Sequence, residues 1–186
     1  MQEESKRQII IETERLILRK VNPDEARMIL DHQGPEGIVF AEGYPGEFSL
    51  EVMDLMVGER AGVAINFTPW FMIRKEEKDV IGEIGWSTPL GLHRPTVGYD
   101  VVEPLWGKGY ATEALRGLMT YLFTLPEVEA VEADTFDHHI ASRRVMEKAG
   151  MVQFDTRTQE ADGEEQTIVF YESWRPEPEE DESAEA

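Results

Sequence analysis

The chain has 186 residues, of which 41% are apolar and 9% aromatic, which is enough for one folded domain with a substantial core. It contains no cysteine, which excludes disulfide scaffolds, thiolate metal sites and a cysteine nucleophile. Its 38 acidic and 18 basic residues give a net charge of -20, which disfavours nucleic acid and anionic membranes as partners.

Part of the acidic excess lies at the C-terminus, where 176–186 holds six acidic residues and no basic one. We therefore expect a single domain over 1–175 followed by a disordered acidic tail. No signal peptide or membrane span is predicted, so we expect a cytoplasmic protein. The remaining acidic excess fits a solvated surface, and the alternative is a site that attracts a cationic substrate.

The first half of the chain predicts two helices between extended segments. Apolar residues alternate in 9–21, which indicates a first strand. Asn22 followed by proline is typical of a helix start, and the helix should reach about His32. A loop rich in glycine and proline spans 34–46, and helical spacing follows over 49–60.

The second half changes between strand and helix patterns. After Gly109, apolar residues recur at helical spacing until Pro126 ends the helix. A second helix is predicted at 141–149. The remaining segments predict strands, and these are 67–74, 80–87, 96–102, 128–136 and a closing hairpin of 151–159 with 166–174. This order predicts an α+β or mixed α/β domain.

A glycine loop between the strand at 96–102 and the long helix carries the clearest chemical signal. Gly107 and Gly109 allow backbone N–H groups to converge on an anion, and the helix N-terminus and Lys108 add positive charge. The spacing matches neither a P-loop, which would need a glycine at Val102, nor a dinucleotide-binding loop, which would need glycine or alanine at Thr112. By spacing alone, a structural turn remains an alternative.

Three segments together resemble one family. The segment 106–114 (WGKGYATEA) is similar to the acyl-CoA loop of the GNAT N-acetyltransferases, in particular their RimJ/RimL-like branch. The segments 13–19 (TERLILR) and 141–151 (ASRRVMEKAGM) resemble the same branch, in the same order. The resemblance implies a GNAT fold, with a central, mostly antiparallel, splayed sheet of about seven strands and about four helices.

The resemblance also implies which residues hold acetyl-CoA. The pyrophosphate would lie on backbone amides of the loop, and the pantetheine arm would pair with the end of the strand before it. His139 stands where the family usually has asparagine, and Arg143 lies near the expected 3′-phosphate, although it could instead pair with Glu147. The implied cofactor-binding residues are Val101, Val102, Gly107, Lys108, Gly109, Tyr110, Ala111, Thr112, His139 and Arg143.

Candidate catalytic groups follow from the chemistry of acetyl transfer, which needs a base for the amine and a donor for the thiolate. Several family members place a tyrosine on the last helix, where this chain has Met146. Ser142 resembles the serine proposed to meet the thiolate in the RimL-like branch, which makes it the candidate donor; the alternative for Ser142 is a helix-capping hydroxyl. The candidate bases are Glu83, Asp100 and Glu160. For each of them, an exposed carboxylate is the alternative, and Glu83 could lie on an outer face of the sheet. No metal site is predicted.

The function that the resemblance implies is transfer of an acetyl group from acetyl-CoA to a primary amine by direct attack. The amine would belong to a protein N-terminus or to a small, possibly cationic molecule, and the enzyme would be a monomer or homodimer. A non-catalytic module that binds acyl-CoA is the main alternative, and a nucleotide-phosphate enzyme is another.

Overall fold

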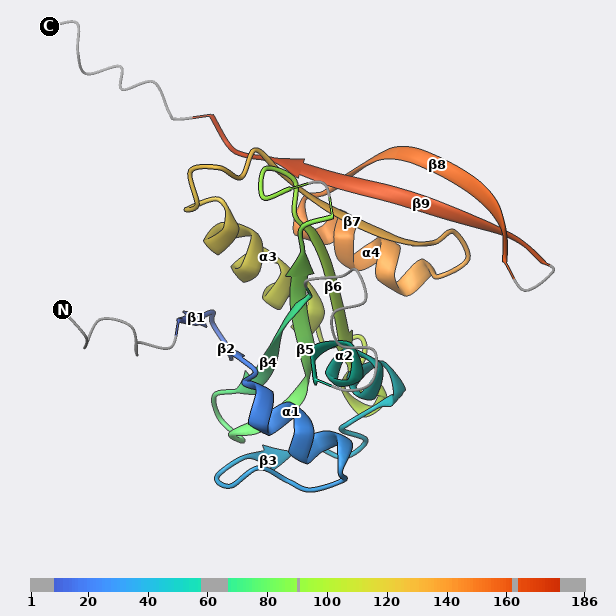
Figure 1. The fold of residues 1–186 in the computed structure, drawn as a ribbon. Helices are drawn as coiled ribbons and strands as arrows, with labels where there is room; N and C mark the ends of the chain where they lie inside the picture. The colour runs from blue at the N-terminus through green and yellow to red at the C-terminus, as the bar shows by residue number, and fades with distance from the viewer. Residues whose placement is uncertain (1–8, 58–66, 90, 162–163, 178–186) are drawn as a thin grey trace, which may run out of the picture.

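A computed structural model of the protein describes residues 9–57, 67–89, 91–161 and 164–177 (Figure 1). Its strands form one sheet with the order β1-β2-β4-β5-β6-β7-β9-β8, and β3 pairs separately with β5. All pairings are antiparallel except β3 with β5 and β6 with β7. The strands are β1 (Ile10–Glu12), β2 (Leu16–Lys20), β3 (Val39–Phe40), β4 (Thr68–Arg74), β5 (Asp79–Ser87), β6 (Thr96–Val101), β7 (Ala130–Phe136), β8 (Val152–Ala161) and β9 (Glu164–Trp174). The predicted mixed, mostly antiparallel fold is confirmed.

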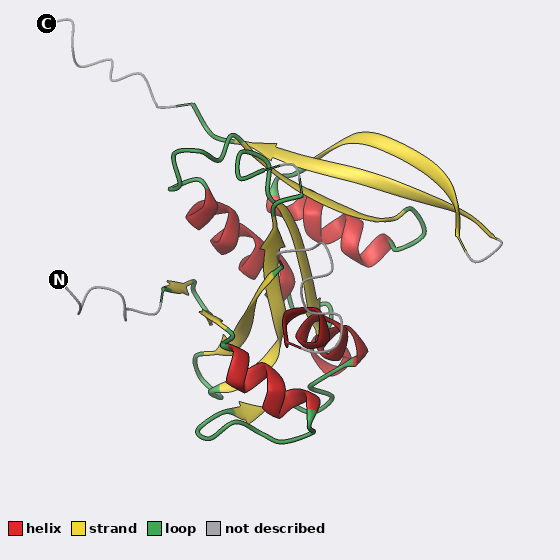
Figure 2. Ribbon diagram, in the orientation of Figure 1, coloured by secondary structure: helices red, strands yellow, loops and turns green. Residues whose placement is uncertain are grey.

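Within the described residues, four α-helices cover the sheet (Figure 2). They are α1 (Pro23–Leu30), α2 (Glu47–Val57), α3 (Tyr110–Leu122) and α4 (Ile140–Ala149). The helices α1 and α2 pack together on one face, and α3 and α4 pack together on the other. None of these helices is long and apolar enough to cross a membrane.

The helix boundaries follow local signals in the sequence. Asn22 caps α1 by accepting from the amides of Asp24 and Glu25, and the Asn22 amide donates to the Glu25 carboxylate. The helix α2 begins at Glu47, two residues before the predicted start, and its predicted extension to 60 falls outside the described residues. Residues 178–186 of the predicted tail also lie outside them.

The predicted first strand is wrong in one respect, because it consists of two strands. A turn at Thr13–Arg15 separates β1 from β2, and the two pair antiparallel. The hydroxyl of Thr13 accepts from the Leu16 amide at 3.1 Å and stabilises this turn. The short strand β3 was not predicted, because two residues in a glycine-rich loop give no periodic signal.

The central strand β5 is covered on both faces by helices, so nearly all of its residues are buried. It also contains a bulge at Ile81, because Met72 pairs with Gly82 whereas Ile73 pairs with Val80. A Cβ atom at Gly82 would lie 2.0 Å from the Asp100 carbonyl oxygen, so the close approach of β5 and β6 at this point requires glycine.

The strands β6 and β7 join the two halves of the sheet through a single ladder pair, Thr96 with Glu132. Beyond this pair the two strands diverge, and the residues Tyr99 to Val101 no longer have a β7 neighbour. The sheet is therefore splayed, as the resemblance implied, and the opening lies beside the N-termini of α3 and α4 (Figure 1).

Candidate active site

A cleft of about 1090 Å³ lies where β6 leaves β7. Its walls come from the turn between β1 and β2, from the end of β6, and from α3 and α4. This volume matches that of a large small-molecule site. Of the residues that sequence analysis selected, those lining the cleft are Asp100, Val101, Gly107, Gly109, Tyr110, Ala111, Thr112, His139 and Ser142.

The loop before α3 presents backbone donors to this cleft. Gly107 and Gly109 both have positive φ, at +73° and +84°, which residues with a side chain rarely adopt. No side chain caps α3, so the first amides of the helix, from Tyr110 to Thr112, have no intrahelical acceptor. The loop therefore offers N–H groups and the positive end of a helix dipole to an anion.

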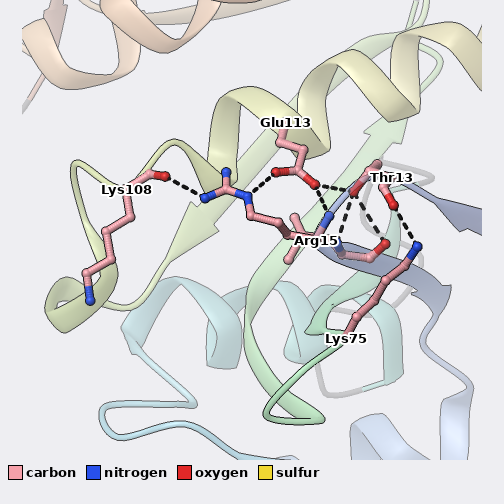
Figure 3. Close-up of polar contacts among 6 residues, drawn as sticks. Thr13, Arg15, Lys75, Lys108 and Glu113 are labelled. Carbon is pink, nitrogen blue, oxygen red and sulfur yellow. Dashed lines mark hydrogen bonds and ion pairs between the residues drawn. The ribbon is translucent and has the colours of Figure 1, made fainter.

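Lys108 and Val102, both expected to bind the cofactor, do not line the cleft. The Lys108 side chain is not part of the cleft wall and extends away from Arg15 (Figure 3). The Trp106 indole N–H donates to the Val101 carbonyl, which anchors the loop to the end of β6. Val102 is buried, and its amide donates to the Ile81 carbonyl at 2.9 Å, so it supports the cleft from behind.

The Glu113 carboxylate connects the β1–β2 turn to α3 (Figure 3). It accepts from the Thr13 hydroxyl at 2.5 Å, from the Arg15 amide at 2.6 Å and from Arg15 Nε at 2.6 Å. These contacts hold the pKa of Glu113 below its usual value, although burial opposes them. Arg15 also donates to the Lys108 carbonyl at 3.0 Å and stacks on Tyr110. One carboxylate therefore fixes the position of the glycine loop.

The opposite wall is formed by α4, whose side chains divide between two surfaces. Ser142 faces the cleft, and its Oγ lies 3.1 Å from Tyr99 Oη. Arg143 does not line the cleft, because it pairs with Asp137 at 2.5 Å and donates to Tyr171 Oη at 3.2 Å. Arg144 and Lys148 line the cleft instead, together with Arg116 of α3.

Two further contacts describe the remaining polar groups of this wall. His139 precedes α4 without capping it, and its Nδ1 lies 3.3 Å from Thr135 Oγ1. Tyr99 Oη donates to the Ser142 carbonyl at 3.1 Å, and burial raises the pKa of Tyr99 to about 12.

The three candidate bases occupy different environments. Asp100 is half-buried and lines the cleft. Burial raises its pKa, while the Val101 amide and the charge of His139 oppose that rise. Glu160 is exposed near the outer end of the β8–β9 hairpin and does not line the cleft. It lies three residues beyond Arg157, the last residue of β8 whose partner on β9 also pairs with β7.

Glu83 is fully buried, so the alternative that it lies on an exposed outer face is wrong. That alternative assumed that one face of β5 meets solvent, whereas helices cover both faces. The Tyr44 hydroxyl and the Ser49 hydroxyl, the latter at 2.7 Å, donate to its two oxygens. Burial raises the pKa of Glu83 to about 7, and the two hydroxyls oppose this rise. Glu83 pairs across the ladder with Asp100 but does not line the cleft.

Comparison with known proteins agrees with this geometry. A family model described as an acetyltransferase (GNAT) domain matches residues 15–152. The chain belongs to the GNAT family. It is 27% identical over 149 residues to the uncharacterized N-acetyltransferase YoaA of Bacillus subtilis, covering 76% of this chain and 81% of that protein. It is 32% identical over 127 residues to the uncharacterized N-acetyltransferase p20 of Bacillus licheniformis, covering 65% of this chain and 70% of that protein.

Solved structures share the GNAT fold at lower identity. A GNAT acetyltransferase from Bacillus anthracis has a TM-score of 0.66 and 21% identity, covering 90% of this chain and 99% of that one. The ribosomal-protein-S5-alanine acetyltransferase of Vibrio fischeri has a TM-score of 0.62 at 16% identity, covering 90% and 97%. A spermidine N-acetyltransferase mutant of Vibrio cholerae has a TM-score of 0.60 and 16% identity, covering 85% of this chain and 94% of that one. Since the last two names give different acceptors at similar TM-scores, the fold does not select an acceptor.

Sequence reasoning missed several residues of this GNAT site. Arg15 and Glu113 lie in the segments that carried the family resemblance, but only the fold shows that they are paired. Tyr44 lies in a glycine-rich loop, and no periodic pattern relates it to Glu83. Tyr99 lies on a predicted strand, and it becomes noticeable only because β6 lacks a partner at that point. Among the described residues, no cluster of histidine and acidic side chains could hold a metal.

Replacing Glu113 with alanine should destabilise the GNAT domain. The change removes a carboxylate that accepts three hydrogen bonds, and it leaves the Arg15 guanidinium without its ion-pair partner. Because Arg15 is partly exposed, water can solvate it, which reduces the loss of stability. We expect the free energy of unfolding to fall by about 2 kcal/mol. Urea titration followed by tryptophan fluorescence measures it. The matched control is Glu127→Ala, an exposed carboxylate after α3, which should change stability little; equal losses in both variants would contradict the linking role of Glu113.

Glu83→Gln should change how stability depends on pH. Because the folded pKa is raised from 4.5 to about 7, the folded protein keeps a proton that the unfolded chain releases. The stabilising contribution of this carboxyl is therefore complete below pH 4.5 and falls as pH rises to 7. The unfolding free energy of the wild type minus that of the variant should fall between pH 5 and 7 and then level off. Urea titrations across this range measure it, with exposed Glu160→Gln as control; a constant difference for Glu83→Gln would refute the prediction.

Proposed function

We propose that this GNAT protein transfers an acetyl group from acetyl-CoA to a primary amine by direct attack, as an enzyme of the RimJ/RimL-like branch. The observation that carries the proposal is the path of the cleft. It runs from the free amides at the start of α3 to the point where β6 leaves β7, and there it meets both Tyr99 and Asp100. Neighbouring residues of a strand point to opposite faces of the sheet. The opening therefore brings groups from both faces to one point.

The residues of the cleft fit a CoA molecule. The free amides from Tyr110 to Thr112 suit a pyrophosphate, and the three cations Arg116, Arg144 and Lys148 suit a further phosphate. Arg143 is replaced in this proposal by Arg144, because its guanidinium contacts Asp137 and Tyr171. When bound, acetyl-CoA supplies an acyl group activated as a thioester.

Asp100 is the proposed base. Of the three candidates, Asp100 alone lines the cleft. It lies on the face of the sheet that α1 and α2 cover, so the group that donates to the thiolate can act from the opposite face. A carboxylate in this place attracts an ammonium group and accepts its proton before attack. Burial raises the pKa of Asp100 and so makes it a stronger base. The side chains of Tyr44 and Ser49 hold Glu83 behind it.

Direct attack is favoured over a covalent enzyme intermediate. The sequence has no cysteine, and the partner of Ser142 Oγ in the described structure is the Tyr99 phenol. A serine nucleophile needs an adjacent base such as histidine or a carboxylate to remove its proton. Ser142 therefore lacks the activation that an acyl-enzyme mechanism requires.

Gly109→Trp should abolish acetyl-CoA binding, because Gly109 lines the cleft with positive φ and its Cβ would lie 3.5 Å from Arg15 Nη2, so that a tryptophan there displaces the loop that presents the amides. Calorimetric titration of acetyl-CoA measures the effect. The control is Gly37→Trp, because Gly37 also has positive φ, at +76°, and has open space around it away from the cleft. We expect saturable binding in the wild type and the control, and none in Gly109→Trp. Equal binding by all three proteins would place the cofactor elsewhere.

Turnover separates the proposed enzyme from the alternative of a binding module. Because the chain has no thiol, a thiol reagent reports released CoA alone. The acceptors to test are spermidine and peptides that begin with alanine or serine. CoA release that depends on one of these amines supports the enzyme, and acetyl-CoA binding without any release would support the module.

A further inference from the structure

We propose that Tyr99 of β6 is a catalytic residue, whose hydroxyl donates a hydrogen bond to the CoA sulfur while the carbon–sulfur bond breaks. The inference rests on the proposed function of the cleft. Tyr99 Oη lies 3.1 Å from both the Oγ and the carbonyl oxygen of Ser142, and both residues line the cleft. The phenol therefore lies between the open edge of β6 and the start of α4.

The other tyrosines of the cleft and Ser142 are less suited to this role than Tyr99. The helix α4 contains no tyrosine, and its Met146 is fully buried in the core. Two more tyrosines line the cleft, but Tyr110 lies under the Arg15 guanidinium and Tyr121 packs among Trp70 and Trp86. Ser142 has a hydroxyl in reach, but an aliphatic hydroxyl is a weaker acid and donor than a phenol.

Ser142 supports this donor rather than replacing it. Since Tyr99 Oη and Ser142 Oγ are within hydrogen-bond distance, the serine can donate to the phenol oxygen while the phenol hydrogen turns from the Ser142 carbonyl to the sulfur. A chain of two hydroxyls polarises the terminal donor. Donors fixed in place before the reaction stabilise developing negative charge most effectively.

The reaction step balances without a proton leaving Tyr99. The amine nitrogen forms a bond to the acyl carbon, and the carbon–sulfur pair stays on sulfur. Asp100 takes one proton from the ammonium group before attack and releases it to water. A second proton, from the nitrogen now bonded to the acyl carbon, follows the same route, and CoA leaves as a thiolate bonded to the Tyr99 hydroxyl. With its pKa raised to about 12, Tyr99 keeps its proton wherever the thiolate forms, because thiols ionise near pH 8.5.

The first test uses CoA itself and needs no acceptor. The ultraviolet absorbance of the thiolate is followed against pH for CoA bound to the wild type, to Tyr99→Phe and to Tyr171→Phe. Tyr171 is the matched control, because its buried hydroxyl also contacts α4, at Arg143 and Glu147, but lies outside the cleft. We expect the pKa of the bound thiol to be about one to two pH units higher in Tyr99→Phe than in the other two. The same thiol pKa in all three proteins would overturn the proposal.

The second test separates a direct contact from a positioning effect. With the best amine of the acceptor screen, Tyr99→Phe should lower kcat roughly ten- to a hundredfold and leave the KM for acetyl-CoA nearly unchanged. In a Ser142→Ala background the loss should persist, because the phenol acts on sulfur. If the loss disappears in that background, Tyr99 only positions Ser142 and the proposal is wrong.

The failures of the two proposals are distinguishable. A wild type that turns over the amine while Tyr99→Phe keeps full kcat overturns the role of Tyr99 and leaves the proposed function intact. A wild type that binds acetyl-CoA but acetylates none of the amines overturns the proposed function, and with it the catalytic role of Tyr99, whatever the thiol titration shows.

Discussion

The Glu113 carboxylate is the interaction on which the cleft depends. It lies in the first turn of α3, where negative charge is favourable, and it holds both the Thr13 hydroxyl and the backbone and side chain of Arg15. Arg15 in turn holds the Lys108 carbonyl and covers Tyr110. The turn after β1 and the glycine loop, almost a hundred residues apart in sequence, are thereby locked together. The free amides of α3 are consequently fixed in direction before any ligand arrives.

The second constraint is the parting of β6 from β7. A sheet normally satisfies its backbone groups with a neighbouring strand, and one ladder pair connects these two strands. The unpaired end of β6 is tolerated because the Trp106 indole N–H donates to the Val101 carbonyl, and because the residues at this end line the cleft. The same parting sets Tyr99 beside Ser142 and leaves Asp100 at the cleft. A structural opening in the sheet and the proposed chemical centre are therefore one feature.

Some of this arrangement could be predicted from the sequence. The helical period after Gly109 located α3, and the Asn22-Pro23 pair located α1. The glycine loop correctly indicated that the N-terminus of α3 faces the cleft. The directions of the side chains were harder to predict. They depend on which face of a helix or strand each residue occupies and on which elements pack against that face. Adjacent arginines on α4 diverge to different surfaces, and Glu83 is buried because β5 carries helices on both faces. Pairings such as Tyr44 with Glu83, 39 residues apart, need the complete fold.

The central claim is that acetyl-CoA lies on the amides between Gly107 and Thr112 and along the open end of β6. Amide hydrogen exchange with and without saturating acetyl-CoA tests it most directly, because exchange reports each segment separately. The account predicts slower exchange on binding in the loop, at the end of β6 and at the start of α4, with the outer β8–β9 hairpin unchanged. Protection confined to the hairpin or to α1 and α2, with the loop unaffected, would contradict it.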